Sequence, residues 1–178
     1  MKVEMDTLEK NKTWEVVDLP RENKPVGCKW VFSVKYKADG SLERYKAILA
    51  AKGYTQTYGV DYQDTFAPVA KINAMRVLLS LAANFDWNLH QFDVKNAFLH
   101  GDLEEEIYMA CLSGFDTYTK KVCRLKKAPY GLKQSPRVWF GRFTKAMFSM
   151  GYKQSQGNHT LFVKHSVRRS DCTPSLCR

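Results

Sequence analysis

Asp93 is the acidic residue best placed to do chemistry. It stands in the string Gln-Phe-Asp-Val at residues 91–94, within an expected buried strand over 89–94 that delivers its carboxylate to the following turn. A carboxylate at such an edge can hold Mg²⁺ through oxygen. Mg²⁺ sites for phosphoryl transfer take two acids plus substrate phosphates, and the sequence contains no Asp-Asp pair. Taken alone, the residues favour Asp93 as the N-cap of a helical turn over 95–99.

Two other polar strings could bind ions or phosphate. The acidic run of Asp102 and residues 104–106 is better explained as an exposed turn than as a catalytic group. The string Gly131 to Pro136 begins a helix, and a helix N-terminus beside Lys133 can receive phosphate or a nucleic-acid backbone. It is not a P-loop, which needs Gly-x-x-x-x-Gly-Lys-Ser/Thr, so taken alone it is an ordinary helix start.

Cysteine spacing argues against a zinc site. The five cysteines are scattered, at positions 28, 111, 123, 172 and 177, and no Cys-x-x-Cys occurs. His159 and His165 precede the last two cysteines at a spacing that matches no common ligand pattern. Cysteine usage therefore fits a reducing compartment.

Basic residues line one face of a predicted β-hairpin. Residues 29–37 alternate apolar and polar, Asp39-Gly40 is a strong two-residue turn, and the returning strand covers 41–50. This turn fixes the register, with the pairs Lys37–Leu42, Lys35–Arg44, Ser33–Lys46, Val31–Ile48, Val34–Tyr45, Phe32–Ala47 and Trp30–Leu49. The resulting basic face carries Lys35, Lys37, Arg44 and Lys46 without an acid, and the other face is apolar and aromatic. Like charges across strands repel, which is compatible with an anionic partner; for an arbitrary hairpin, a solvated outer face is the better explanation.

The other elements are expected to form the core. Helices are predicted over 1–12, 71–85 and 136–150, and short strands over 14–17, 104–109 and 122–125. The middle helix carries its core stripe at Ile72, Met75, Leu78, Leu79 and Ala82. Residues 167–178 are polar, basic and aperiodic, which is typical of a disordered tail or of a foreign reading frame.

Composition bounds the class of protein. The 178 residues are 44% hydrophobic with a formal charge of +10, which excludes wholesale disorder and favours a polyanionic partner. A soluble protein that is merely basic is the alternative. No apolar run approaches the roughly 20 residues of a membrane helix, and the polar N-terminus is not a signal peptide. We therefore expect no membrane contact, no secretion, and a cytoplasmic or nuclear location.

Together these strings resemble the reverse transcriptase domain of Ty1/copia-type LTR retrotransposon polyproteins. The matching segments run in the family's order from near Met1 to about His165 and comprise residues 14–17 (WEVV), 27–32 (GCKWVF), 36–40 (YKADG), 51–56 (AKGYTQ), 65–69 (TFAPV), 91–101 (QFDVKNAFLHG), 130–137 (YGLKQSPR) and 159–162 (HTLF). The resemblance implies an α+β fold, with reverse-transcriptase-like fingers plus a partial palm and helices packed on an antiparallel sheet. Residues 1–165 would be the partial reverse transcriptase domain, and 166–178 a divergent, disordered tail.

The resemblance also implies roles for individual residues. Asp93 would be the first metal-binding aspartate of the palm and would hold Mg²⁺ against the incoming triphosphate and the primer 3′-hydroxyl. Phe98 lies where such enzymes place a steric gate that favours dNTPs. The remaining implied contacts are with the nucleotide, at Lys46, Tyr130 and Gly131, and with template-primer RNA or DNA, at Lys35, Lys37, Arg44, Lys133 and Gln134.

Departures from the family pattern shape the expected function. Ile48 stands where the family has Arg, which should weaken nucleotide binding by one charged hydrogen bond, ~1.5–3 kcal/mol. The family's Tyr-Val-Asp-Asp hairpin, which completes the metal site with Asp93, does not occur, so the chain is expected to be truncated before it. We expect a fragment of an RNA-directed DNA polymerase that is inactive alone. A non-catalytic basic nucleic-acid-binding module and a decayed gene product are the alternatives, and the oligomeric state stays open.

Overall fold

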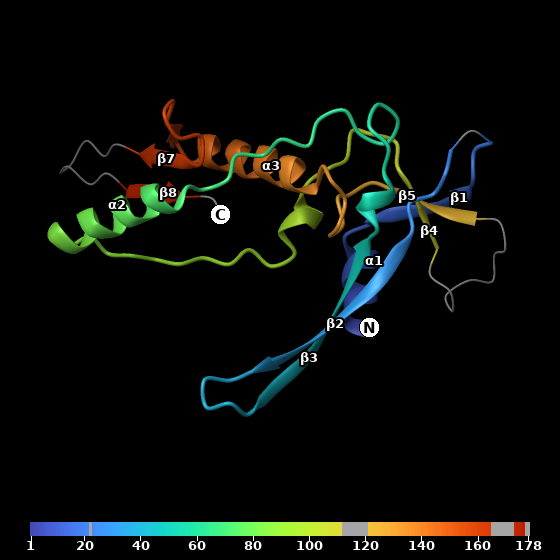
Figure 1. Cartoon of the computed structure of the whole chain (residues 1–178), viewed down its shortest axis with the longest axis horizontal. Coiled ribbons are helices and arrows are strands. Elements are labelled where there is room, and N and C mark those ends of the chain that lie inside the picture. The colour runs from blue at the N-terminus through green and yellow to red at the C-terminus, as the bar shows by residue number, and fades with distance from the viewer. Residues whose placement is uncertain (22, 112–120, 165–172, 177–178) are drawn as a thin grey trace. The chain divides into compact units, whose positions relative to one another are not determined.

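The computed structural model describes residues 1–21, 23–111, 121–164 and 173–176. The chain forms two compact units. The first comprises Met1–Thr65 and Asn96–Trp139, and the second Phe66–Lys95 and Phe140–Arg178. Helices combine with three antiparallel sheets, whose strand orders are β1-β5-β4, β2-β3 and β6-β7-β8 (Figure 1). This agrees with the predicted mixture of helices and antiparallel strands.

A small sheet and the N-terminal helix build the base of the first unit. Helix α1 spans Lys2–Lys10, strand β1 spans Trp14–Asp18, β4 spans Tyr108–Ala110 and β5 spans Lys121–Leu125. The helix and the strands predicted at 14–17 and 122–125 are confirmed. The strand predicted over 104–109 is shorter than expected, because regular pairing with β5 begins only at Tyr108.

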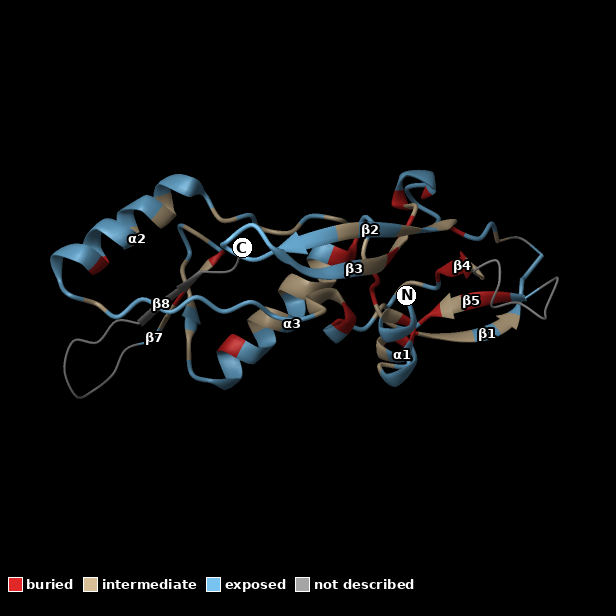
Figure 2. Cartoon of the chain, turned by 90° about the horizontal axis from the view of Figure 1, so that it is seen from below, coloured by how far each residue is buried: buried red, intermediate tan, exposed pale blue. Residues whose placement is uncertain are grey.

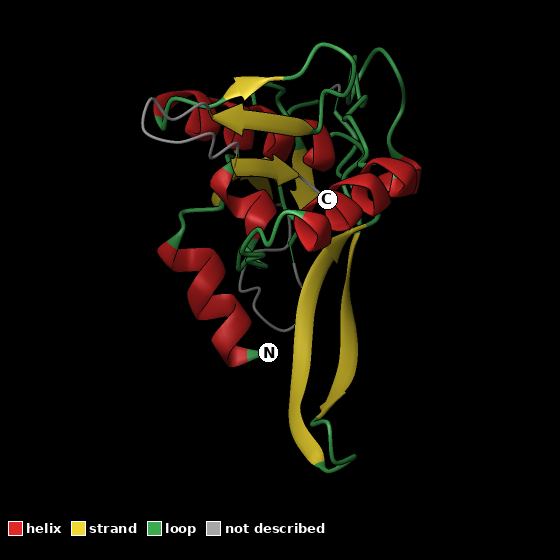
Figure 3. Ribbon diagram, turned by 90° about the vertical axis from the view of Figure 1, so that its left-hand side faces the viewer, coloured by secondary structure: helices red, strands yellow, loops and turns green. Residues whose placement is uncertain are grey.

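A long hairpin, β2 (Cys28–Tyr36) with β3 (Leu42–Ala51), is the second sheet of this unit (Figure 3). The predicted register is confirmed from Trp30–Leu49 to Lys35–Arg44. The predicted Lys37–Leu42 pair is wrong, since Tyr36 pairs with Leu42 and leaves Glu43 as the extra residue of a β-bulge.

The turn of the hairpin is longer than predicted. The amide of Gly40 donates to the carbonyl of Lys37, and the amide of Lys37 donates to the carbonyl of Ser41, so residues 38–40 form a three-residue loop. Gly40 takes a φ of +82°, the left-handed conformation that such a loop requires at its last position.

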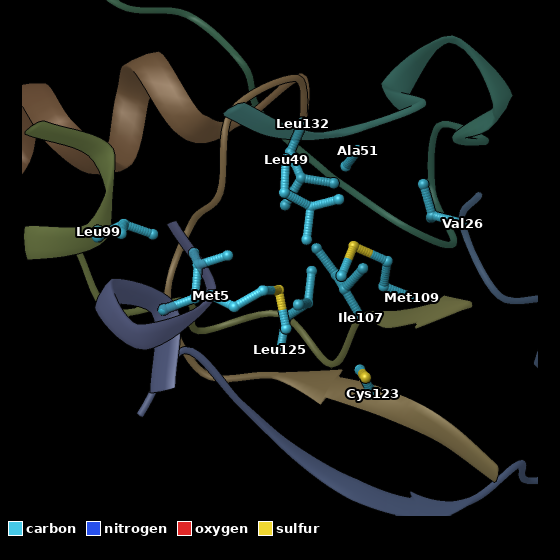
Figure 4. Close-up of a cluster of buried hydrophobic side chains, with 11 residues drawn as sticks. Met5, Val26, Leu49, Ala51, Leu99, Ile107, Met109, Cys123, Leu125 and Leu132 are labelled. Atoms are coloured by element: carbon cyan, nitrogen blue, oxygen red, sulfur yellow. The ribbon is translucent and has the colours of Figure 1, made fainter. Parts of the chain in front are cut away.

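The hydrophobic core of the first unit lies between α1, strands β4 and β5, and the end of β3 (Figure 4). The buried side chains come from each part of the unit and comprise Met5, Leu8, Val26, Leu49, Ala51, Leu99, Ile107, Met109, Cys123, Leu125 and Leu132. Residues near the ends of β2 and β3 join this core, whereas the hairpin residues toward the loop are exposed.

The second unit is built around Phe162. Helix α3 (Ser135–Ser149) leads from the first unit into the second, and strands β6 (Lys153–Gln154), β7 (Leu161–Lys164) and β8 (Thr173–Leu176) form its sheet. Phe162 is fully buried, and its ring meets those of Phe140, Phe143 and Phe148 at centroid distances of 5.4–6.4 Å. Helix α3 matches the helix predicted over 136–150.

Helix α2 (Ile72–Asn84) forms as predicted, but its apolar stripe does not form a core. Of the five predicted core residues only Ala82 is buried, and Ile72 and Leu79 are more than half exposed. Figure 2 shows most of α2 in the colour of exposed residues. An amphipathic helix buries its stripe only where another element packs on it, and the described part of the second unit covers little of this one.

Two further predictions differ from the structure. Residues 89–94 are extended without strand pairing, so the predicted buried strand is wrong. Within the predicted tail, residues 173–176 form β8 antiparallel to β7, because β7 offers a second edge for backbone pairing. The rest of 166–178 lies outside the described residues. None of the helices formed by the described residues has the length and apolar character needed to span a membrane.

Candidate functional site

The first part of the site is a close backbone crossing at residues 129–134, here called the Tyr130 turn. The amide of Ala51, at the end of β3, donates to the carbonyl of Tyr130 over 2.7 Å. Gly131 has a φ of +93°, and a Cβ there would fall 2.2 Å from the Ala51 carbonyl oxygen. A Cβ on Gly53 would likewise fall 2.1 Å from the Gly131 carbonyl oxygen. The glycines at 53 and 131 therefore allow the end of β3 and the Tyr130 turn to touch.

This crossing sets the position of the Tyr130 ring. The rings of Phe98 and Tyr130 meet edge to face, with centroids 5.0 Å apart and planes at 77°. Phe98 is carried by a 3-10 turn, Ala97–His100, that follows Asn96 in the left-handed conformation. Two residues with an implied nucleotide contact are thus brought together, half-buried, at one place in the first unit.

A buried amide pair fixes the Tyr130 turn from behind. Gln56 Nε2 donates to Gln134 Oε1 over 3.0 Å, and the Lys133 amide donates to Gln56 Oε1 over 2.9 Å. Gln134 Nε2 donates in turn to the Asp61 carbonyl over 3.1 Å. Gln134 is fully buried and Gln56 is 5% exposed. The structure therefore places Gln134, one of the residues with an implied nucleic-acid contact, in the interior.

Lys133 is held at the surface beside this pair. Its Nζ donates to the Gln56 carbonyl over 3.3 Å and to the Tyr62 hydroxyl over 3.0 Å, and it lies 4.7 Å from the centroid of the Tyr62 ring. Sequence reasoning missed Gln56 and Tyr62. Gln56 lies 78 residues before its partner Gln134, and no local pattern links the two.

Three residues of the predicted basic face, Lys35, Arg44 and Lys46, share one face of the hairpin, and Lys37 lies beyond the register shift. Lys35 pairs with Arg44 and Ser33 with Lys46, so their side chains share one face. Lys35, Lys37, Arg44 and Lys46 are all exposed. Arg44 lies 3.8 Å from the neighbouring Glu43, and no ion pair involves the three lysines within the described part of the chain. This face can attract phosphate.

The opposite face of the hairpin presents aromatic rings. Phe32 is 66% exposed and Tyr45, two residues along and on the paired strand, is 77% exposed. A pocket of about 340 Å³ is lined by Met1, residues 32–34 and residues 45–47 of the hairpin. Exposed rings of this kind can stack on nucleic-acid bases.

Asp93 belongs to the second unit and is exposed in an extended segment. It does not cap the 3-10 turn that follows, because Asn96 occupies the N-cap position. Among the residues that the structure describes, no three His, Cys, Asp or Glu side chains gather into a possible metal site. One carboxylate is not the ligand set of a Mg²⁺ site for phosphoryl transfer, so we assign no metal-dependent step to the described residues.

The acidic run makes structural ion pairs. Asp102 lies 2.5 Å from Lys127 Nζ, Glu105 pairs with Arg137 in the same unit, and Glu106 accepts from the Tyr108 hydroxyl over 2.6 Å. The hydrogen bond to Glu106 raises the pKa of Tyr108 above its ordinary value. These contacts support the structural explanation of this run rather than a catalytic one.

Comparison with known proteins places the chain in a family. The sequence profile of the reverse transcriptase (RNA-dependent DNA polymerase) family matches residues 11–170. The chain belongs to this family. Its curated relatives include Pol polyproteins of the copia/Ty1 type, and the reverse transcriptase fragment is therefore of that type.

Three relatives show the range of similarity. The Retrovirus-related Pol polyprotein from transposon TNT 1-94 of Nicotiana tabacum is 47% identical over 92% of this chain and 12% of its own length. That from transposon RE1 of Arabidopsis thaliana is 44% identical over 86% of this chain and 11% of its own length. The Transposon Ty1-ER2 Gag-Pol polyprotein of Saccharomyces cerevisiae is 32% identical over 92% of this chain and 9% of its own length. No solved structure matches the chain significantly.

Proposed function

We propose that this reverse transcriptase fragment carries part of the nucleotide- and template-contacting surface of a copia-type polymerase, and that the 178-residue chain does not polymerise alone. The observation that carries the proposal is the contact between Phe98 and Tyr130. Two aromatic residues 32 positions apart in the sequence are held together by the crossing of Ala51 and Gly131. Such a half-buried aromatic pair suits contact with the sugar and base of a nucleotide.

The proposed lack of activity rests on the carboxylates. In-line displacement by two metal ions needs several carboxylates that hold both ions, and Asp93 is the only acid among residues 87–94. A complete two-metal site would therefore need further carboxylates besides Asp93. We propose that the chain comprises the fingers and part of the palm of such a polymerase.

Primer extension tests this proposal. The chain and an Asp93→Asn variant are each incubated with an RNA template, a DNA primer, Mg²⁺ and dNTPs. We expect no extension by either protein. Extension that disappears in the Asp93→Asn variant would show that other carboxylates complete the site, and the proposed inactivity would be wrong.

A second candidate function is non-catalytic binding of single-stranded RNA or DNA. The exposed hairpin carries cations on one face and aromatic rings on the other. Proteins that bind single strands without sequence preference combine these two features, since cations neutralise phosphates and rings stack on bases. The binding would be sequence-independent and would weaken with salt.

Fluorescence anisotropy with a labelled RNA oligonucleotide tests the binding function. A triple Ala variant of Lys35, Arg44 and Lys46 removes three charges from the hairpin. The matched control is a triple Ala variant of Lys2, Lys10 and Lys24, which removes three exposed charges elsewhere. Each phosphate contact contributes ~0.7 to the slope of log affinity against log salt concentration for a single strand. We therefore expect this slope to become shallower by about 2 in the hairpin variant and to stay unchanged in the control. Equal slopes in both variants, or no binding at low salt, would contradict the proposal.

A further inference from the structure

Three cysteine side chains gather beside strands β4 and β5 of the first unit. Cys28 begins β2, Cys123 lies in the middle of β5, and Cys111 directly follows β4. All three are reduced thiols in the structure. The sulfur atoms of Cys111 and Cys123 are 3.4 Å apart.

Strand pairing accounts for this closeness. Met109 pairs with Cys123 across the antiparallel β4–β5 ladder. Side chains two residues apart along a strand share a face, so Cys111 lies on the same face as Met109 and Cys123. Both sulfur atoms are therefore on one side of the sheet, and Cys111 packs against the core to which Cys123 belongs. Figure 4 shows the place of Cys123 in this core.

The two cysteine residues differ in burial. Cys123 is 5% exposed and belongs to the hydrophobic core, whereas Cys111 is only partly buried. A dissolved oxidant therefore meets Cys111 first, and Cys123 is the thiol that lies within reach of the oxidised sulfur.

Cys28 is the competing thiol, and its surroundings lower its reactivity. Its Sγ donates to the Ala110 carbonyl oxygen at 3.4 Å. Burial raises the pKa of the Cys28 thiol above its ordinary value, a shift that the nearby Lys52 only partly opposes. Since the thiolate is the reactive form, this shift slows attack by Cys28 on an oxidised Cys111, whereas the Cys123 sulfur already lies 3.4 Å from the Cys111 sulfur.

We propose that Cys111 and Cys123 form a redox-modification site that closes to an intramolecular disulfide on exposure to a peroxide. A disulfide needs a sulfur–sulfur distance of about 2.05 Å, so the two sulfur atoms must approach by little more than ~1 Å. A side-chain rotation of either residue can supply a movement of this size.

The reaction proceeds in two balanced steps. The Cys111 sulfur attacks one peroxide oxygen, the O–O bond breaks, and the thiol proton leaves with the departing hydroxide as water, which gives a sulfenic acid. The Cys123 sulfur then attacks the Cys111 sulfur, the S–O bond breaks, and the second thiol proton leaves with that hydroxide as water. Two thiols are oxidised, and one peroxide is reduced to two waters.

Tryptic mapping of the whole chain tests the proposal. The protein is treated with hydrogen peroxide, alkylated and digested, and Cys28, Cys111 and Cys123 then fall on different peptides, 22–29, 96–120 and 122–124. We expect a dithiothreitol-reversible link between the last two peptides and the loss of two of the five thiols. A Cys28→Ser variant should form the same link, and a Cys111→Ser variant should not.

A denatured control separates the fold's contribution from chance pairing. In concentrated urea the same treatment should yield mixed pairs that include Cys28 and the peptide 170–178, which carries both remaining cysteines. Mixed pairs from the native protein, a native link through Cys28, or five unchanged thiols would each overturn the proposal.

Discussion

Gly131 and Ala51 approach so closely that a Cβ on residue 131 would stand 2.2 Å from the Ala51 carbonyl oxygen. Gly131 also has a φ of +93°, a backbone conformation that is strained for any residue with a Cβ. We therefore expect Gly131→Ala to lower the free energy of unfolding by at least ~1–3 kcal/mol, measured by urea denaturation.

Gly141 provides the matched control for this substitution. It lies inside helix α3, is exposed, and a Cβ there would meet no atom within 4 Å. Gly141→Ala should raise the free energy of unfolding by roughly 0.5–1 kcal/mol, because alanine loses less backbone entropy in a helix. Destabilisation by both variants to the same extent would contradict the close crossing at Gly131.

Gln56 and Gln134 should contribute to stability as a unit. Gln56→Ala removes the acceptor of the Lys133 amide and the donor to Gln134 Oε1. Buried polar groups left without partners each cost roughly 1–3 kcal/mol, so Gln56→Ala and Gln134→Ala should each lower the free energy of unfolding by that order. The double variant should lose less free energy of unfolding than the two single variants added together, because the hydrogen bond between Gln56 and Gln134 can be lost only once.

Gln63 serves as the control for these substitutions. It is exposed, and its amide donates to the Gly59 carbonyl at 3.3 Å. Gln63→Ala should change the free energy of unfolding by less than ~0.5 kcal/mol. Strictly additive losses at 56 and 134 would show that the two amides act independently.

The hairpin could be predicted from the sequence because its information is local. Strict alternation and the Asp39-Gly40 signal fix the register from Trp30 to Lys35, and the structure confirms it. The bulge at Glu43 could not be foreseen, because a three-residue and a two-residue loop share the same Asp-Gly signal. Lys35, Arg44 and Lys46 still share one face, since the register shift begins beyond the Lys35–Arg44 pair, and only Lys37 lies past it.

Non-local features were beyond sequence reasoning. Nothing near Gln56 indicates that its amide is buried against Gln134, and glutamine is more often exposed. Periodicity correctly predicts that α2 is a helix but cannot say whether another element covers its stripe. The apolar content of 89–94 predicts a strand, yet strand formation needs a neighbouring edge to pair with.

Ion pairing at Glu15 should make stability depend on pH. Glu15 lies 2.6 Å from Lys126 Nζ and 2.5 Å from an Arg124 guanidinium nitrogen. The hydrogen bond from Lys126, followed by the charges of Arg124 and Lys126, lowers the pKa of Glu15 below its ordinary value of 4.5. Because the folded pKa is depressed, this stabilisation is present above 4.5 and disappears as the pH falls through the folded value.

Urea denaturation of the protein and a Glu15→Gln variant checks this dependence. The variant should be less stable than the protein at about pH 7, and the difference in the free energy of unfolding should shrink as the pH falls below 4.5. High salt at neutral pH should also reduce the difference in stability between the protein and the variant, because Arg124 and Lys126 are solvent-accessible and salt screens their attraction to Glu15. A difference that persists unchanged in acid would assign the effect of the substitution to packing.

Ile48 interrupts the basic face at a defined point of the ladder. It pairs with Val31, one cross-strand step beyond Ser33–Lys46 on the same face. Val31 is 42% exposed, so an Arg at 48 can lay its aliphatic stem over it and keep its charge in solvent. Ile48→Arg should add one phosphate contact, tighten RNA binding by ~1.5–3 kcal/mol and steepen the salt slope by ~0.7. Ile48→Gln, which changes polarity without charge, should leave the slope unchanged, and anisotropy titrations at several salt concentrations measure both. Identical slopes for the two variants would mean that nucleic acid does not contact this face.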